Sequence, residues 1–209
     1  MCIISLVINL KYLVDSINNY SDDEYNLFLN LIKDTKKREI IKIKDFNVRK
    51  RKILGEILLI KLLDSVNINY NDISINKNEF GKPYLDCGVF FNISHSYDYV
   101  VCSISKSEIG IDIEMIRDIS ESVIKHICCV NEIDFIYKSN NINYYGFCFF
   151  TLKEAYFKCL GRDLFNIKSV SFDIKDEIVC SDETVDCYQY NFQNYIISVC
   201  KKKEITDNK

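Results

Sequence analysis

Residues 109–114 alternate strictly between apolar and polar side chains, in the order Ile-Gly-Ile-Asp-Ile-Glu. Because successive side chains of a β-strand point to opposite faces, this alternation predicts a strand with three isoleucines on its buried face. The opposite face then carries Asp112 and Glu114 side by side. Two close carboxylates repel each other, so the pair requires either open water or a bound cation. Mg²⁺ suits such all-oxygen ligands, whereas the simpler alternative is a half-exposed strand with a hydrated acidic face.

The other hydrophobic patterns along the chain indicate the class of fold. We expect further strands at residues 1–10, 89–93, 99–104, 170–174, 185–190 and 195–199. We expect helices at residues 21–33, 47–63, 121–138 and 144–160, where apolar residues recur at three- and four-residue intervals. The central strands 89–93, 99–104 and 109–113 are predicted to be neighbours in one sheet. Strand, helices and strands occur twice in this order, which predicts an α+β fold with halves at residues 1–104 and 105–209.

The charge balance argues against a general affinity for nucleic acid. The 209 residues include 27 Lys and Arg and 30 Asp and Glu, for a net charge of −3. No global field therefore attracts nucleic acid or an anionic membrane surface, and an anionic ligand must be held by local charge. The apolar opening meets Lys11 far short of the ~20 residues that cross a bilayer, and it has no signal-peptide features. We expect a cytoplasmic chain with no membrane partner.

The ten cysteines form no Cys-x-x-Cys pair, and only two histidines are available to complete a zinc site. We interpret the cysteines as reduced and mostly buried thiols of a cytosolic protein. The adjacent Cys128 and Cys129 are expected to be two small apolar residues within the helix 121–138.

The sequence Phe-Phe-Thr-Leu-Lys-Glu-Ala-Tyr-Phe-Lys at residues 149–158 predicts a helix with a charged pair on one face. Glu154 and Lys158 are four residues apart, so their side chains lie together. Apolar residues surround the pair, which indicates that the helix is buried over much of its circumference. Such a setting favours charges that point into a cleft, although an ordinary surface ion pair is the alternative.

A third feature is Phe-Asn-Ile-Ser-His-Ser at residues 91–96, where two hydroxyls flank an imidazole at the end of a strand. Ser94, His95 and Ser96 offer hydrogen-bond donors to phosphate oxygens. No acid or cysteine follows at a spacing that suggests a catalytic triad. The alternative is a structural role, in which the serines cap the strand end and the histidine makes a local hydrogen bond.

Basic residues at two further places complete the pattern. Residues 49–52, Arg-Lys-Arg-Lys, lie at the predicted N-terminus of the helix 47–63. Positive side chains oppose the helix dipole there, so a bound anion would relieve the conflict, although simple hydration is equally compatible. The turn Gly81-Lys82-Pro83 joins a flexible glycine to a rigid ring and directs the side chain of Lys82.

These motifs, in this order and at these distances, resemble the Sfp-type 4'-phosphopantetheinyl transferases. They are Gly-Lys-Pro at 81–83, Phe-Asn-Ile-Ser-His-Ser at 91–96, Gly-Ile-Asp-Ile-Glu at 110–114 and Lys-Glu-Ala-x-x-Lys at 153–158. Arg51 with residues 54–56 looks like the family's earlier helix motif, and Phe150 stands where the family usually has tryptophan. The resemblance implies a pseudo-dimer of two similar α/β halves with coenzyme A in the cleft between them. The length of the chain fits this larger, monomeric type and not the short, trimeric synthases.

The resemblance also implies the reaction and its catalytic residues. Asp112, Glu114 and Glu154 would be Mg²⁺ ligands, and Glu154 and Lys158 would be catalytic. The reaction would transfer the 4'-phosphopantetheine group of coenzyme A to a serine of an acyl or peptidyl carrier protein and release 3',5'-ADP. The competing interpretations are a coenzyme A or nucleotide-binding protein without turnover, and a metal-dependent phosphohydrolase.

The same resemblance assigns the contacts to coenzyme A, mostly in the N-terminal half. Ser94 and His95 would hold its phosphates, and Arg51 would bind the 3'-phosphate. Lys82, presented beside Pro83, would contact the nucleotide portion. Lys158 would reach the pyrophosphate from the C-terminal half.

Overall fold

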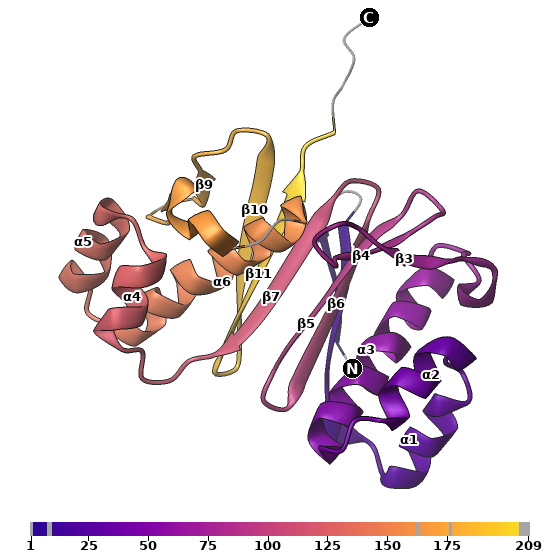
Figure 1. The fold of residues 1–209 in the computed structure, drawn as a ribbon. Coiled ribbons are helices and arrows are strands. Elements are labelled where there is room, and N and C mark those ends of the chain that lie inside the picture. Colours follow the sequence, from indigo (N-terminus) through magenta and orange to yellow (C-terminus); the bar gives the residue numbers. More distant parts are fainter. Residues whose placement is uncertain (1, 8–9, 162–163, 176, 205–209) are drawn as a thin grey trace, which may run out of the picture.

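Seven of the strands in the computed structural model form two antiparallel sheets, which meet in the centre of the molecule (Figure 1). The structure describes residues 2–7, 10–161, 164–175 and 177–204. The larger sheet has the order β1-β2-β6-β5, with β1 at Cys2–Val7, β2 at Leu10–Ser16, β5 at Phe90–Ser96 and β6 at Tyr99–Ser105. The smaller has the order β10-β11-β7, with β7 at Ile109–Met115, β10 at Val185–Phe192 and β11 at Tyr195–Lys202.

The central strands exist as predicted, but the prediction that all three pair in one sheet is wrong. β5 and β6 form a hairpin, whereas β7 pairs with β11 from far along the chain. Two further short hairpins join β3 at Ile75–Lys77 to β4 at Pro83–Leu85, and β8 at Phe172–Asp173 to β9 at Val179–Cys180. The expected first strand at 1–10 is part of a β1–β2 hairpin, and residues 1, 8 and 9 of it lie outside the described residues.

Helices cover the two sheets on opposite sides of the molecule (Figure 1). The N-terminal group is α1 at Asp22–Leu29, α2 at Asp34–Ile41 and α3 at Phe46–Asp64. The C-terminal group is α4 at Glu121–Ile127, α5 at Val130–Lys138 and α6 at Ile142–Leu160. Single turns of 3₁₀ helix lie at Ile17–Asn19 and Tyr70–Asp72, and a longer 3₁₀ segment lies at Leu164–Ser169. The chain therefore has the predicted α+β class.

Two of the predicted helices end earlier than expected. α1 begins at the predicted cap, where Ser21 and Glu24 exchange hydrogen bonds, but it stops at Leu29 because Leu27 and Leu31 are exposed and provide no buried stripe. A separate helix, α2, follows. The expected helix 121–138 is likewise divided, because Cys128 ends α4 and Cys129 begins α5. The two cysteines thus form the extended junction between the two helices and do not lie within one helix.

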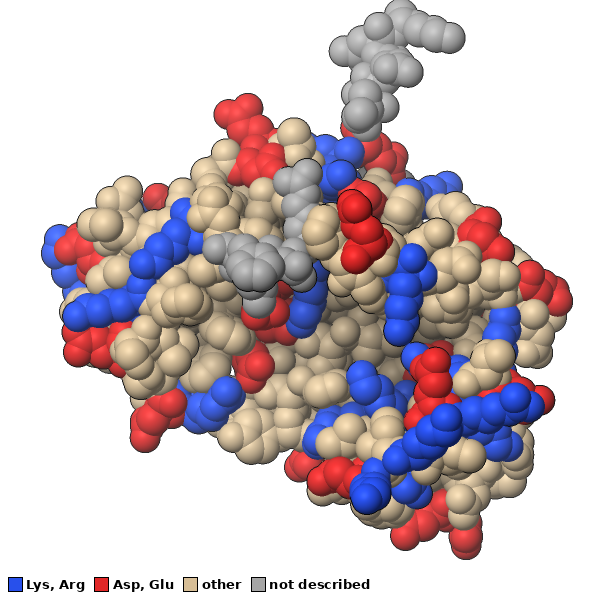
Figure 2. Space-filling model, in the orientation of Figure 1, with Lys and Arg blue, Asp and Glu red and all other residues tan. Residues whose placement is uncertain are grey.

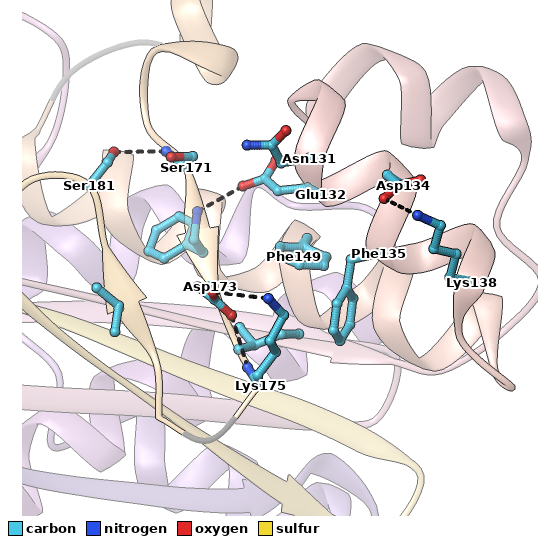
Figure 3. Close-up of a pocket in the computed structure, with 13 residues that line it drawn as sticks. Asn131, Glu132, Asp134, Phe135, Lys138, Phe149, Ser171, Asp173, Lys175 and Ser181 are labelled. Atoms are coloured by element: carbon cyan, nitrogen blue, oxygen red, sulfur yellow. Dashed lines mark hydrogen bonds and ion pairs between the residues drawn. The ribbon is translucent and has the colours of Figure 1, made fainter.

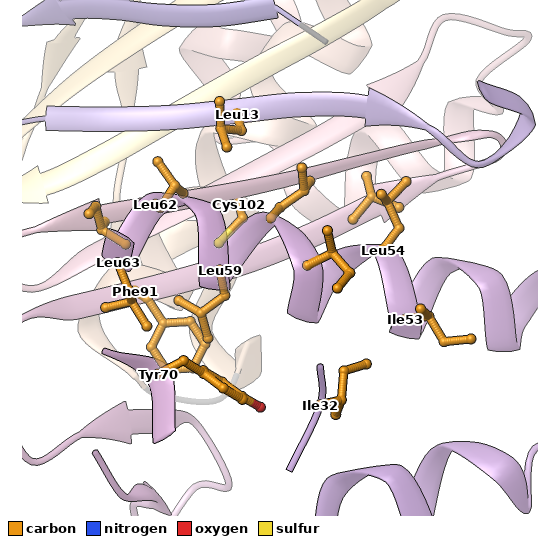
Figure 4. Packing of buried hydrophobic residues seen from close by; sticks show 14 of the residues in the cluster. Leu13, Ile32, Ile53, Leu54, Leu59, Leu62, Leu63, Tyr70, Phe91 and Cys102 are labelled. Atoms are coloured by element: carbon orange, nitrogen blue, oxygen red, sulfur yellow. The ribbon is translucent and has the colours of Figure 1, made fainter. Parts of the chain in front are cut away.

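Three of the four apolar clusters in the described part of the chain hold the layers together. The N-terminal cluster packs α3 against β5 and β6, and Figure 4 shows Leu54, Leu59 and Leu62 of α3 within it. A C-terminal cluster surrounds α6. The third cluster lies between the two sheets and includes Ile109, Ile111 and Ile113, none of which is exposed. This confirms the buried face predicted for residues 109–114. No helix in the described part of the chain is both long and apolar enough to cross a bilayer.

Candidate active site

β5 and β7 belong to different sheets, and polar side chains of β5 connect them. Asn92 accepts a hydrogen bond from the backbone N–H of Ile111 at 2.9 Å. Ser94 donates to Asp112 Oδ1 at 2.8 Å. Because Asn92 and Ser94 are two residues apart on one strand, they lie on the same face and meet successive parts of β7. The serine-rich strand end therefore contacts the acidic strand directly.

A glycine brings α6 against the same strand. A Cβ atom added to Gly110 would lie 2.3 Å from the backbone nitrogen of Cys159, so only glycine permits this approach. Lys158 lies in the last turn of α6, next to Cys159. Its ammonium lies 2.5 Å from Asp112 Oδ1. The ammonium also donates to Ser94 Oγ at 3.1 Å. β5, β7 and α6 thus converge on one point.

Glu154 joins this cluster from the preceding turn of α6, where its Oε2 atom lies 3.8 Å from Lys158 Nζ. Burial raises the pKa of Glu154, and the nearby Asp112 and Glu114 carboxylates raise it further, while Lys158 opposes them. Burial also raises the pKa of Asp112, which is only 3% exposed. Burial alone would lower the pKa of Lys158, but the surrounding carboxylates raise it. Lys158 is therefore held in its charged form.

These residues line a pocket with a volume of about 470 Å³. Its polar lining includes Arg51, Ser94, His95, Asp112, Glu154 and Lys158. Glu114 and Pro83 line it as well. Figure 2 shows that this face of the molecule is hollowed near its centre. Basic residues lie on one side of the hollow, over the N-terminal helices. All predicted site residues except Lys82 therefore contribute to one pocket wall.

The basic end of the pocket is formed by α3 and the end of β5. Arg51 donates to the carbonyl oxygen of Tyr97 at 2.9 Å, and its Nε is buried with no partner among the described residues. Burial lowers the pKa of His95, as do the nearby Lys52 and Arg51 cations. The imidazole is therefore neutral at pH values where a free histidine would already be charged, and its ring N–H can donate to an anion.

Known proteins match the chain over nearly its whole length. A model of the N-terminal part of 4'-phosphopantetheinyl transferases matches residues 19–107, and a model of the 4'-phosphopantetheinyl transferase superfamily matches residues 108–200. The chain belongs to the 4'-phosphopantetheinyl transferase superfamily.

Curated relatives carry the same description. The 4'-phosphopantetheinyl transferase gsp of Aneurinibacillus migulanus is 33% identical over 144 residues, which cover 68% of this chain and 61% of the relative. The 4'-phosphopantetheinyl transferase Sfp of Bacillus subtilis is 26% identical over 194 residues, which cover 86% of each chain. The match to HetI of a Nostoc species is 27% identical over 125 residues, or 57% of this chain and 52% of the relative. The alignment therefore covers most of the Sfp relative, whereas the chain spans only about three fifths of the length of gsp.

The carboxylates of the pocket offer oxygen ligands of the kind that Mg²⁺ prefers. Asp112 Oδ2 is buried and has no hydrogen-bond partner among the described residues, which fits an atom that binds a cation. Within the same residues, however, no three acidic, histidine or cysteine side chains already enclose a metal position. Lys158 explains this arrangement, because its ammonium draws Asp112 and Glu154 toward itself. The residues fit the metal by their chemistry, but as they stand Lys158 pairs with two of the three carboxylates.

Lys82 lies beside the pocket and not on its lining. Its ammonium donates to the backbone carbonyl oxygens of Ile109 at 3.1 Å and Cys159 at 2.8 Å. It thereby joins the Gly81–Pro83 turn to β7 and α6. Its predicted contact with the nucleotide stays a prediction, and a ligand would have to compete with these two carbonyls for it.

Two charged residues of the pocket were not among the predicted site residues. Lys36 lines the pocket from α2, and Glu56 lines it from α3. Glu56 is 7% exposed, accepts a hydrogen bond from Tyr70 at 2.9 Å and lies 4.0 Å from Lys36. Glu56 belongs to the motif at residues 54–56 but had no assigned role, and Lys36 had none either.

A second cavity of about 620 Å³ lies in the C-terminal half, between α5 and the β8–β9 hairpin (Figure 3). Phe135 and Phe149 form part of its wall, and Asp134 pairs with Lys138 at 2.7 Å on its rim. Its buried Glu132 is neutralised by Lys153 at 2.9 Å. None of the predicted site residues lines this cavity in the described part of the chain. The serine-rich pocket is therefore the candidate active site.

Proposed function

We propose that the chain transfers the 4'-phosphopantetheine group of coenzyme A to a serine of an acyl or peptidyl carrier protein and releases 3',5'-ADP. One observation supports this reaction above all. A proton acceptor, Glu154, and a cation, Lys158, meet the buried carboxylate of Asp112 in a pocket whose other end is basic. Binding of coenzyme A alone would not require an acid–base pair at the far end of such a pocket.

The basic end accounts for binding of the anionic co-substrate. Arg51 would hold the 3'-phosphate, because its guanidinium is a cation at the basic end of the pocket. Ser94 and His95 would bind phosphate oxygens through a hydroxyl and a neutral ring N–H. These residues belong to the half at 1–104, whereas the acid–base residues belong to the half at 105–209. We assign the two halves as a pseudo-dimer with coenzyme A between them.

The acidic end accounts for the chemistry. When bound between Asp112, Glu114 and Glu154, Mg²⁺ would neutralise charge on the pyrophosphate. Glu154 accepts the proton of the carrier serine, directly or through a water, as the serine oxygen attacks the β-phosphorus. The bond from that phosphorus to 3',5'-ADP then breaks. Lys158 stabilises the negative charge on the departing phosphate oxygen.

We also propose a cellular compartment and an oligomeric state for the chain. Nine cysteines in the described part of the chain are free thiols, which supports a reducing compartment such as the cytoplasm. We assign the chain as a monomer, since residues of both halves reach the one pocket.

Intact-mass measurement on a panel of apo-carrier proteins tests the proposal. The panel should contain fatty-acid, polyketide and nonribosomal peptide carriers, incubated with coenzyme A and Mg²⁺. We expect at least one carrier to gain the mass of one phosphopantetheine group with release of an equal amount of 3',5'-ADP. Tight binding of coenzyme A without any mass gain would indicate a binding protein. Release of free phosphopantetheine in the absence of carrier would indicate a phosphohydrolase.

A further inference from the structure

Ser96 is the last residue of β5, and it contacts the second carboxylate of β7. Its hydroxyl donates to Glu114 Oε2 at 2.9 Å and accepts a hydrogen bond from the backbone N–H of Met115 at 3.3 Å. Ser96 is only 6% exposed. Because β5 and β7 do not pair through their backbones, this hydroxyl satisfies a backbone donor of β7 and orients the neighbouring carboxylate at once.

Arg117 holds the same carboxylate oxygen from the other side. Its Nη1 atom lies 3.0 Å from Glu114 Oε2 and 3.1 Å from the carbonyl oxygen of Met115. The guanidinium lies over two aromatic rings, 4.7 Å from the ring centre of Phe147 and 5.7 Å from that of Tyr97. Cation–π contacts of this kind restrict where the guanidinium can move. The carboxylate of Glu114 is therefore held by two donors from separate parts of the chain.

Both donors use Oε2, and Oε1 of Glu114 receives no hydrogen bond from the described residues. Asp112 shows the same division of its two oxygens. Its Oδ1 accepts hydrogen bonds from Ser94 and Lys158, and its Oδ2 is buried and unpartnered. In each carboxylate a serine of β5 restrains one oxygen and leaves the other for a ligand.

We propose that Ser96 and Arg117 are positioning residues, which hold the Glu114 carboxylate so that its Oε1 atom can bind the divalent cation. This inference rests on the proposed function, in which Glu114 is a metal ligand. Neither residue would contact the cation or coenzyme A, and both would act only through Glu114. Removing the hydrogen bonds that orient a metal-binding carboxylate weakens metal affinity by about 10- to 100-fold in other proteins.

Mn²⁺ binding to the full chain in the presence of coenzyme A tests this inference, since the electron paramagnetic resonance signal of free Mn²⁺ gives a dissociation constant without turnover. We expect Ser96→Ala to raise that constant by about 10-fold or more. Ser96→Thr, which keeps the hydroxyl, should stay within about 3-fold of the unaltered chain. Transfer by Ser96→Ala should recover at high Mg²⁺, because the variant loses affinity and not chemistry.

Ser103→Ala is the matched control. Ser103 is a fully buried serine of the adjacent strand β6, and its hydroxyl has no hydrogen-bond partner among the described residues. Its replacement should leave Mn²⁺ affinity unchanged. Glu114→Gln should weaken Mn²⁺ binding by itself, and adding Ser96→Ala to it should cause no further loss, because the serine then has no carboxylate to orient.

Three results would overturn the inference. The first is a Mn²⁺ affinity of Ser96→Ala within 2-fold of that of the unaltered chain. The second is an equal loss of Mn²⁺ affinity when Ser96→Ala is made in the unaltered chain and in the Glu114→Gln variant. Failure of the unaltered chain to bind Mn²⁺ would remove the metal role of Glu114, while its transfer activity would still test the proposed function separately. Should Ser96→Ala not fold, Arg117→Met replaces it, since that side chain is 42% exposed and the same weakening is expected.

Discussion

Gly110 of β7 and Ala155 of α6 lie so close together that a Cβ atom on the glycine would be 2.0 Å from the carbonyl oxygen of the alanine. This contact sets the distance between the strand that carries Asp112 and the helix that carries Glu154 and Lys158. Backbone atoms form both sides of it, so neither side can turn away as a side chain can. The spacing of the whole site therefore depends on the absence of one methyl group.

Gly110→Ala should strongly destabilise the fold, because the strand and helix must separate. We expect a loss of about 3 kcal/mol or more in the free energy of unfolding, measured by urea denaturation, at the upper end of the cost of overpacking. Gly146→Ala is the matched control within α6. A Cβ there would lie 3.0 Å from Cγ2 of the Ile119 side chain, which can shift, so the change should stay within about 1 kcal/mol. Equal effects of the two variants would contradict the prediction.

Glu154→Gln should abolish most transfer and preserve coenzyme A binding. The amide keeps the shape of the side chain but cannot accept the serine proton, so we expect turnover to fall by about 100-fold or more. Affinity for coenzyme A, measured by calorimetry, should stay within about 3-fold, since Glu154 lies away from the basic end of the pocket. Asp134→Asn, which alters a helical acid paired with Lys138 outside this pocket, is the control. Transfer near the native rate would rule out Glu154 as the base.

Arg51→Met should weaken binding of coenzyme A much more than binding of dephospho-coenzyme A, which lacks the 3'-phosphate. A charge-assisted contact to phosphate is worth about 1.5 to 3 kcal/mol, which corresponds to a roughly 10- to 100-fold change in affinity. Arg49→Met serves as the control, because Arg49 donates to the carbonyl oxygen of Ile43 and does not line the pocket. Equal losses for both ligands would show that Arg51 does not contact the 3'-phosphate.

Glu56→Gln should stabilise the fold increasingly as pH rises. Burial raises the pKa of Glu56 in the folded chain, and the hydrogen bond from Tyr70 and the charge of Lys36 offset only part of this effect. A group whose pKa is raised by folding contributes its full stability below its unfolded pKa and loses that stability as pH rises through its folded pKa. The glutamine has no charge to bury, so its advantage in urea midpoint should grow from about pH 4.5 upward. A difference that is independent of pH would contradict this.

Much of the site could be predicted from sequence because its residues belong to short local patterns. The alternation of residues 109–114 indicated a strand with its isoleucines buried, and the three isoleucines are fully buried. The four-residue interval between Glu154 and Lys158 indicated one helix face, and the two groups lie 3.8 Å apart. Periodicity of this kind follows from backbone geometry within a few residues, so it can be read without knowledge of distant contacts.

Local patterns did not reveal how separate segments meet. Leu27 and Leu31 have helical spacing but are exposed, and α1 ends between them. Ser96 could be noticed as a hydroxyl near the histidine, but its bond to Glu114 depends on how β5 lies against β7. Lys82 faces backbone carbonyls of two later segments instead of the pocket lining. Each of these outcomes depends on residues that are distant in the chain.

The amino-acid sequence alone determined the α+β class, the acidic strand, the charged helix face and the resemblance to the phosphopantetheinyl transferases. Each of these depends on residue types at short intervals. Only the tertiary structure decided that β7 pairs with β11, that Gly110 admits α6, and that Lys158 neutralises Asp112. The physical reason is that pairing and close packing are collective. They are set by which distant surfaces exclude water from one another, and no short segment contains that information.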